Sequence, residues 1–325
     1  MRDLFRYFLS FLSFYIKNDI SKFKKYNLVI NNEIIKKLKK KKIIKLRKKT
    51  HTIFNKEIIN LIEKKKLINF LRNSFIQKMF FIHNRLFIKN ELNEIRKDKN
   101  YFSQWKNLLK EDEVGDPIRY FLYPKSSGNK IRQVYHLKKF CDFTSINIKT
   151  IKKIIEIGGG YGCMARIFSK INDKIKYTIF DTFEVNLLQY YFLKLNKLDV
   201  AIENNKSKIN LISSLKINNE INYKNISKTL LIANWSLSEM PLKLRNKILK
   251  LIFKIPHILI SFQDKFENIN NLKYFKKIKR ELDKKGYETQ ISGLKYYNNA
   301  ILNTNKHFYL FATKISNKNL IMRKN

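Results

Sequence analysis

The chain contains little cysteine. Cys141 and Cys163 are the only two in 325 residues, and their spacing matches neither a disulfide framework nor a paired zinc-ligand motif. We therefore expect a reduced, cytoplasmic setting. The five histidines are scattered and the sequence shows no compact cluster of carboxylates, so we predict chemistry without a resident metal ion.

Glycine and proline are also scarce, with 8 and 4 residues, and neither occurs before Gly115. The start of the chain therefore lacks the usual helix breakers. Apolar residues recur there at helical spacing, as in Ile58, Ile59, Leu61, Ile62, Leu67, Ile68, Phe70 and Leu71. We predict an α-helical N-terminal region over residues 1–114.

The segment 115–150 has a different composition. Gly115, Pro117, Pro124 and Gly128 interrupt the helical periodicity, and aromatic residues cluster around them. Long ordered connections often carry function. We expect a connecting segment that packs on the following domain and can act as a lid.

The apolar start of the chain, "LFRYFLSFLSFYIK", is too short to cross a membrane and contains Arg6. It also lacks a small-residue cleavage site, which argues against a signal peptide. We favour the packing of an N-terminal helix. The alternative is peripheral contact with an anionic membrane surface, helped by the nearby "KFKKY".

Acidic residues are few: 26 Asp and Glu stand against 68 Lys and Arg, which gives a formal net charge of +42. Such a balance is typical of nucleic-acid binding. However, the excess is mostly lysine and is spread along a chain that is also rich in Ile and Asn. A dedicated patch would be local and richer in arginine, whose fork suits phosphate. We favour a compositional origin, and nucleic acid stays an open but disfavoured partner.

From residue 151 onward, strand and helix patterns alternate. Apolar strands such as "KKIIEIG" and "KYTIFD" are followed by helices such as "CMARIFSKI" and "FEVNLLQYYFLKLN", and two strands without an intervening helix end the chain. We predict an α/β domain over 151–325, with a Rossmann-like, doubly wound, mostly parallel sheet and an antiparallel C-terminal edge. Ligands of such sheets bind beyond the carboxyl ends of the strands.

A glycine-rich turn, "EIGGGYG", follows the first strand, with Gly158, Gly159, Gly160 and Gly162. It allows close approach of a ligand, and the next helix start offers free amides to a carboxylate or phosphate. The pattern ending at Ala165 matches a permissive dinucleotide fingerprint. Against a dinucleotide stands Glu156, because its carboxylate would repel a pyrophosphate but attract the ammonium group of a methionine moiety.

Asp181 closes the second strand, where these folds place the acidic residue that holds ribose hydroxyls. The alternative is an N-cap for the following helix. A later strand ends in "ANWSLSEMP". We expect Asn234 and Trp235 to face the cofactor cleft there.

The residues after Trp235 are expected to face the acceptor: Ser236, Ser238 and Glu239. The alternative for Ser238 and Glu239 is a cap on the helix that starts near Pro241. Both roles are compatible for Glu239.

In this order, "EIGGGYG", "FDTFEV" and "NWSLSEMP" resemble the S-adenosylmethionine-dependent class I methyltransferases, and more narrowly the sugar O-methyltransferase family of bacterial polysaccharide gene clusters. The upstream "GDP…GN…IRQVYHL" is similar to the segment before the domain in that family. The resemblance covers roughly residues 115 to 315. Cys163 departs from it, since the family commonly has a small residue such as glycine there.

The resemblance implies S-adenosyl-L-methionine as the cofactor. It puts the methionine portion on the glycine turn, Glu156, Gly158, Gly160 and Gly162, with Gly159 in the same loop. It also implies that Asp181 binds the ribose, that Thr182 and Phe183 lie beside the adenine, and that Asn234 lies near the sulfonium.

Methyl transfer from a sulfonium is an in-line displacement, and a sugar hydroxyl reacts better with a positioned base. Our first candidate for the base is Glu239, and the second is His136. His136 lies in the lid-like segment with Arg132 and Tyr135, which we expect to contact the substrate. For His307 we expect a packing role.

Four hypotheses stay open at this point. The first is an O-methyltransferase acting on a sugar hydroxyl of a glycan, a nucleotide-sugar or another small acceptor. The second is a nucleic-acid methyltransferase, which the charge motivates. The third is an NAD-dependent oxidoreductase, and the fourth is a helical adaptor whose Rossmann-like domain only binds a ligand.

Overall fold

The structure is a computed structural model that describes residues 8–9, 12–40, 49–80, 88–204, 206–213, 226–298 and 305–315, with the backbone alone for 49–52. The chain divides into two compact units that alternate along the sequence. The first unit comprises Met1–His136, Gly160–Ile171 and Thr182–Leu211, and the second comprises Leu137–Gly159, Asn172–Asp181 and Ile212–Asn325. The division into 1–114, 115–150 and 151–325 stays a prediction.

A mostly parallel sheet runs through the described residues. Its strands are β3 (Lys153–Ile157), β4 (Lys176–Asp181), β5 (Val200–Ile202), β6 (Ile209–Ser213), β7 (Thr229–Asn234), β8 (His257–Gln263), β11 (Tyr287–Gly293) and β12 (His307–Lys314). Their order is β11-β12-β8-β7-β3-β4-β6-β5. β3 is parallel to β4 and β7, β7 to β8, and β5 to β6, whereas β12 is antiparallel to β8 and β11. The predicted Rossmann-like, doubly wound fold is confirmed.

The strand order reverses at β3. From β3 the chain moves to β4 on one side, and it returns later to β7 on the other side. A doubly wound sheet binds its ligands outside the carboxyl ends of the strands at such a reversal. The glycine-rich turn follows β3 at this position.

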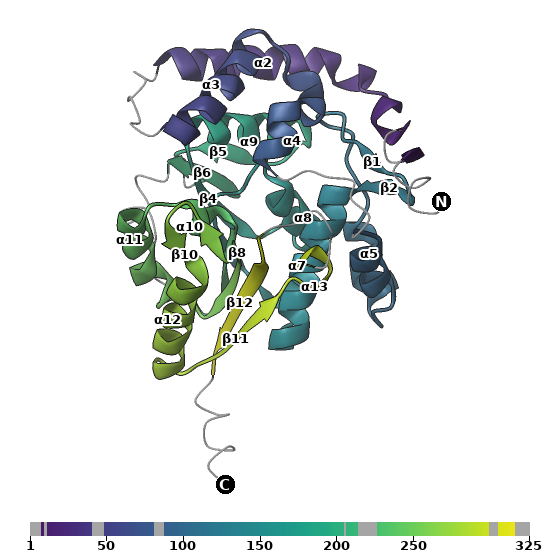
Figure 1. Cartoon of the computed structure of the whole chain (residues 1–325). Coiled ribbons are helices and arrows are strands. Elements are labelled where there is room, and N and C mark those ends of the chain that lie inside the picture. The colour runs from purple at the N-terminus through teal and green to yellow at the C-terminus, as the bar shows by residue number, and fades with distance from the viewer. Residues whose placement is uncertain are drawn as a thin grey trace. The chain divides into compact units, whose positions relative to one another are not determined.

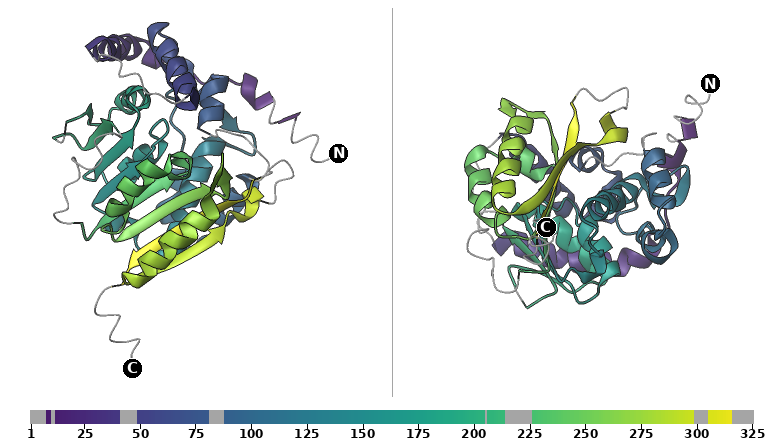
Figure 2. Two further views of the ribbon diagram at one scale, coloured as in Figure 1. Left: turned by 60° about the vertical axis from the view of Figure 1, so that its left-hand side comes forward. Right: turned by 90° about the horizontal axis from the view of Figure 1, so that it is seen from below.

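Local sequence explains the strands and helices of the second unit. "KIIEI" in β3 and "TLLIAN" in β7 are near-continuous apolar runs, as expected for strands covered on both faces. Helices α10 (Ser236–Glu239) and α11 (Leu242–Ile252) connect β7 to β8. Helix α12 (Asn271–Lys284) follows the small hairpin β9 (Lys265–Phe266) and β10 (Ile269–Asn270). Phe275, Ile278 and Leu282 recur at helical spacing in α12 and are buried. Figure 2 (left) shows α12 against the green and yellow strands β8, β12 and β11.

The C-terminal strands differ in detail from the expectation of two strands without a helix between them. A short helix, α13 (Lys295–Asn298), follows β11, and β12 lies inside the sheet between β8 and β11. "HFYLFATK" in β12 is mostly buried, whereas "YETQISG" in β11 alternates between buried and exposed positions. The more apolar strand therefore takes the inner place and the amphipathic one the edge.

The predicted N-terminal helices are present in the described part of the first unit. They are η1 (Ser21–Phe23), α2 (Lys24–Lys40), α3 (Lys49–Glu63), η2 (Leu67–Arg72), α4 (Ser74–Met79), α5 (Ile88–Arg96), η3 (Tyr101–Trp105) and α6 (Lys106–Leu108). Two further helices of this unit are α8 (Cys163–Ile171) and α9 (Phe183–Leu195). α2 and α3 pack on α9 (Figure 1). The hydroxyl of Tyr191 in α9 donates to Asn27 Oδ1 in α2.

The segment 115–150 contains more regular structure than its composition indicates. β1 (Arg119–Tyr120) and β2 (Tyr123–Ser127) form a short hairpin, followed by α7 (Gly128–Thr144) and η4 (Ile148–Thr150). Gly128 thus begins a 17-residue helix instead of interrupting one. Ser127 Oγ accepts a hydrogen bond from the Lys130 amide at 3.1 Å, as a helix cap does.

None of the helices in the described parts of the chain is long and apolar enough to cross a membrane. Of the apolar start of the sequence, only residues 8–9 and those from 12 onward are described. The rest of that stretch lies outside the described residues.

Candidate functional site

The first half of the glycine turn is held by contacts at the end of β3. The Gly158 amide donates to the carbonyl of Phe180 at 2.8 Å, and Gly158 has a φ of +71°. A Cβ on Gly158 would overlap the side chain of Ser236, with Ser236 Oγ 2.9 Å away. Ser236 Oγ itself donates to the carbonyl of Ile157. Both the space and the backbone conformation therefore require glycine here.

Glu156 lies beneath this turn. Its side chain is buried, and its Oε2 accepts a hydrogen bond from the Tyr177 hydroxyl at 2.8 Å. A Cβ on Gly159 would lie 2.9 Å from the same oxygen and 2.7 Å from Ile179 Cγ2. Burial raises the pKa of Glu156 to about 8; the Tyr177 hydrogen bond opposes this shift and the Asp181 charge adds to it. A cation bound beside Glu156 would favour its ionised form.

Asp181 and Asn234 end the strands on either side of β3, and both are half-buried. Asn234 Oδ1 accepts from Ser261 Oγ at 3.0 Å. The next residue, Trp235, has a φ of +59°, a left-handed conformation that non-glycine residues rarely adopt and that recurs at ligand sites. Its buried indole N–H donates to His307 Nδ1 at 2.7 Å, which fixes the end of β7.

The short helix α10 carries the remaining predicted acceptor residues. Ser238 is fully buried, and its hydroxyl bonds to the Gln263 side chain at 2.7 Å. The amide of Gln263 donates to Glu239 Oε1 at 3.3 Å. Burial raises the pKa of Glu239 to about 7, against the effect of that hydrogen bond. A carboxyl group with this pKa can exchange a proton near neutral pH, as a general base must.

The second half of the glycine turn belongs to the first unit. Gly160 has a φ of +56°, and its carbonyl accepts from Gln189 Nε2 at 2.9 Å. A Cβ on Gly160 would lie 3.4 Å from the Phe80 ring. Tyr161 is buried, and its hydroxyl accepts from Asn129 Nδ2 at 2.8 Å. Aromatic and amide side chains from α7, α9 and the segment after α4 therefore surround this half.

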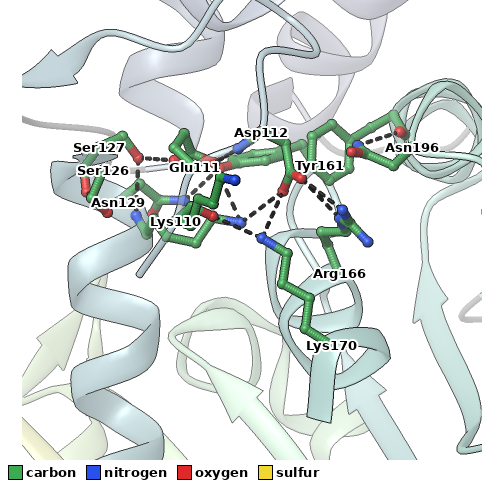
Figure 3. A network of polar contacts seen from close by, with 12 residues as sticks. Lys110, Glu111, Asp112, Ser126, Ser127, Asn129, Tyr161, Arg166, Lys170 and Asn196 are labelled. Carbon is green, nitrogen blue, oxygen red and sulfur yellow. Dashed lines mark hydrogen bonds and ion pairs between the residues drawn. The ribbon is translucent and has the colours of Figure 1, made fainter. Parts of the chain in front are cut away.

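A buried ionic network lies next to this half of the turn (Figure 3). Lys130 is fully buried, with its Nζ 3.3 Å from Glu111 and 3.4 Å from Asp112. Arg166 and Lys170 of α8 also pair with Asp112, at 2.7 Å and 3.5 Å. Burial alone would raise the pKa of Asp112, but Lys130, Arg166 and Lys170 hold it well below its usual range. The network ties α8 to the start of α7 and to the segment before β1.

Gly162, Thr182 and Phe183 stand at the starts of α8 and α9. Gly162 has a φ of +96°, and a Cβ there would lie 3.4 Å from Leu193. Thr182 is the N-cap residue of α9, and its Oγ1 bonds to Asn55 Oδ1 of α3 at 3.3 Å. Asp181 is thus not the cap residue, and the alternative of an ordinary N-cap for it is wrong.

His136, Arg132 and Tyr135 lie on α7 in the first unit and are all buried. Burial, with the Arg132 charge, lowers the pKa of His136 well below its ordinary value. The Tyr135 hydroxyl donates to Glu94 Oε2 at 3.1 Å. The proposed contacts of these three residues with a substrate stay predictions.

The second unit therefore groups Glu156, Gly158 and Gly159 with the strand ends Asp181 and Asn234. Sequence reasoning missed Tyr177, Phe80, Asn129 and Gln189 as neighbours of the turn. Only Gln189 carried a signal, as a polar residue within the apolar helix "FEVNLLQYYFLKL". Among the described residues, no group of His, Cys, Asp and Glu side chains could hold a metal ion, and metal-independent chemistry stays a prediction.

No protein-family model matches the sequence, and no curated protein matches it either. Several solved methyltransferase structures are similar. The methyltransferase domain of bacterial CtHen1-CN shares 16% identity over 57% of this chain and 98% of that one, with a TM-score of 0.40. A SAM dependent methyltransferase from Aquifex aeolicus shares 14% over 55% and 87%, with a TM-score of 0.39. A ribosomal protein L11 methylase from Lactobacillus delbrueckii subsp. bulgaricus shares 12% over 57% and 80%, with a TM-score of 0.36.

These similarities are weak in identity and in TM-score, and they assign neither a ligand nor a reaction to this chain. The fold class rests on the order and direction of its own strands.

Proposed function

We propose that the protein is an S-adenosylmethionine-dependent methyltransferase. The observation that carries the proposal is the buried carboxyl group of Glu156, 2.9 Å from where a side chain on Gly159 would begin, at the reversal point of a doubly wound sheet. An ammonium group would favour the ionised form of Glu156 and pair with it, whereas a pyrophosphate would be repelled by that form. The resemblance of the three sequence motifs points to the same ligand.

The residues of this site are of the kinds that such a cofactor needs. Ser236, Ile179 and Glu156 occupy the space that side chains on Gly158 and Gly159 would need, so the backbone of the turn carries no side chain there. Glu156 would hold the ammonium, and Asp181 at the end of β4 would accept from the ribose hydroxyls. Asn234 would lie near the sulfonium. When bound, the cofactor supplies an electrophilic methyl group.

Glu239 is the proposed general base. Its pKa of about 7 means that much of the carboxyl group is ionised at neutral pH and can take a proton from an acceptor hydroxyl. Gln263 donates a hydrogen bond to Glu239, which orients the carboxylate. His136 remains the second candidate.

For the acceptor we propose a sugar hydroxyl of a glycan or nucleotide-sugar. The support is the resemblance of "NWSLSEMP" and its companion motifs to the sugar O-methyltransferase family. The competing acceptor is a nucleic acid, which the net charge of +42 favours.

Calorimetry with S-adenosylmethionine, S-adenosylhomocysteine and NAD tests the cofactor. We expect both sulfur compounds to bind and NAD not to bind. Asp181→Ala should weaken binding about 10- to 100-fold, since a charged hydrogen-bond acceptor is lost. Asp173→Ala, at an exposed aspartate, is the matched control. Binding of NAD alone would overturn the proposal.

Transfer of a labelled methyl group to nucleotide-sugars, oligosaccharides and oligonucleotides tests the acceptor. We expect labelled sugar. Glu239→Gln should lower kcat about 100-fold or more while cofactor binding is kept, and wild-type kcat should rise with pH through about 7. If His136→Gln lowers kcat by this amount and Glu239→Gln stays active, His136 would be the general base instead. Labelled oligonucleotide alone would replace the sugar acceptor by nucleic acid.

A further inference from the structure

Large exposed apolar side chains are concentrated near the start of the described chain. Between residues 8 and 29 they are Phe8, Leu12, Phe14, Tyr15, Ile16, Tyr26, Leu28 and Val29. Phe14, Tyr15 and Ile16 follow one another and are 43%, 64% and 64% exposed. Single exposed apolar residues are ordinary, but a consecutive group of this size marks an interaction surface.

The backbone of this triplet is fixed. The Arg72 guanidinium donates to the carbonyls of Phe14 and Ile16 and also pairs with Asp116. Asn18 donates to Asp116 Oδ1 from both its amide and its side chain. These bonds hold the backbone of the triplet, and the Arg72 guanidinium also lies 5.8 Å from the centroid of the Phe14 ring. A partner can therefore bind the triplet without first ordering the chain.

Lysines follow the triplet in the chain. Lys17, Lys22, Lys24 and Lys25 are exposed, with Lys22 paired to Glu113, and Asp19 is the acidic residue in this stretch. Lysine is a compact, strongly hydrated charge, and clustered lysines attract acidic lipids. Apolar and aromatic side chains flanked by lysines are the combination found on proteins that lie on anionic membranes.

We propose that residues 14–25 dock the protein on an anionic membrane surface. Phe14, Tyr15 and Ile16 enter the headgroup region, and Lys17, Lys24 and Lys25 attract acidic lipids. The proposal does not depend on methyl transfer. A short exposed apolar strip followed by exposed lysines matches a lipid surface, which offers an apolar interior behind acidic headgroups.

Flotation with vesicles tests the proposal. We compare vesicles of phosphatidylcholine alone with vesicles that also contain phosphatidylserine. The full-length wild-type protein should bind only the second kind, and salt should weaken binding. The triple variant Phe14→Ser, Tyr15→Ser, Ile16→Ser should bind at least about tenfold less tightly, since apolar burial is lost. Phe102→Ser, at another exposed aromatic residue, should bind as the wild type does.

Charge is tested separately. Replacing Lys17, Lys24 and Lys25 by Gln should weaken binding about fivefold for each lysine removed. The matched control replaces three exposed lysines of α12, Lys273, Lys276 and Lys277, by Gln and loses the same charge. Equal weakening in both charge variants, or unchanged binding of the apolar triple variant with its folding confirmed by circular dichroism, would overturn the proposal. Self-association that the apolar variant abolishes, without vesicle binding, would assign the surface to a second copy.

Discussion

The two halves of the glycine turn are held by different kinds of interaction. Gly158 and Gly159 are held by the sheet, through the Phe180 carbonyl and through side chains that leave no space for a Cβ. Gly160 and Tyr161 are held by polar and aromatic side chains, with Gln189 on one carbonyl and Asn129 on the Tyr161 hydroxyl. The first half is defined by tight contacts that leave no space for a Cβ, and the second by hydrogen bonds and ring contacts with more space.

This difference separates two requirements of a ligand site. A close approach of backbone to ligand requires a backbone held in a fixed position, and the ends of parallel strands supply it. The second half is held by several side-chain contacts, and each hydrogen bond among them contributes only about 1 kcal/mol. A substitution in the first half should therefore cause a large loss of stability. A substitution around the second half should cause a small loss, except in the buried ionic network.

The largest effect is expected from Lys130→Met. It removes the cation that pairs with the buried Glu111, while Asp112 keeps Arg166 and Lys170; breaking a buried ion pair in this way costs about 3–5 kcal/mol. Urea unfolding should show the loss. Lys149→Met, at an exposed lysine, should change stability by less than about 0.5 kcal/mol. A Lys130→Met variant as stable as the wild type would show that the buried ionic network contributes little to the stability of the fold.

Gly158→Ala should cost about 2–4 kcal/mol of unfolding free energy, since a Cβ would overlap Ser236 and the φ is left-handed. Gly160→Ala is the matched variant. It has a similar φ, but its Cβ would meet only the Phe80 ring at 3.4 Å, so about 1–2 kcal/mol is expected. Equal losses of unfolding free energy in the two variants would show that the two halves of the turn are packed equally tightly.

The pH dependence of ligand affinity tests Glu156. Because burial raises its pKa to about 8, the free protein holds the proton at neutral pH. Binding of a cation requires the ionised form, so affinity for S-adenosylhomocysteine should rise with pH, by up to about tenfold per pH unit, and level off above about 8.

Calorimetry between about pH 6 and 9 measures this dependence, because that range spans the titration of Glu156. In Glu156→Gln the proton-linked rise should disappear, while the geometry beneath Gly159 is kept. The same slope in wild type and variant would mean that another group titrates.

The smallest effect is expected from Phe80→Ala. The Phe80 ring lies against Gly160 and against Tyr161, with the ring centroids of Phe80 and Tyr161 6.1 Å apart. Loss of this packing should weaken cofactor binding about 2- to 10-fold. Phe75→Ala, at an exposed phenylalanine of α4, should leave the dissociation constant unchanged. Equal dissociation constants in the two variants would show that the Phe80 ring does not help to position the second half of the turn.

Much of the fold was predictable because its signals are local. The alternation of apolar strands and amphipathic helices predicted the doubly wound sheet, and the strand ends predicted where Glu156, Asp181 and Asn234 would lie. The helix over Gly128–Thr144 was not predicted, because its glycine is at the first position, where it does not break a helix, and Ser127 caps it from outside.

The sequence by itself determined the alternation of strands and helices after residue 151, the glycine turn and the polar residues at the strand ends. The periodicity of apolar residues and the conformational freedom of glycine are local properties, so both can be recognised from the sequence. The tertiary structure alone decided that β12 lies inside the sheet, that Tyr177 holds Glu156 beneath Gly159, and that Asn129 and Phe80 contact the second half of the turn. These contacts join residues far apart in the chain, and the burial they create, which sets the pKa of Glu156, exists only in the packed protein.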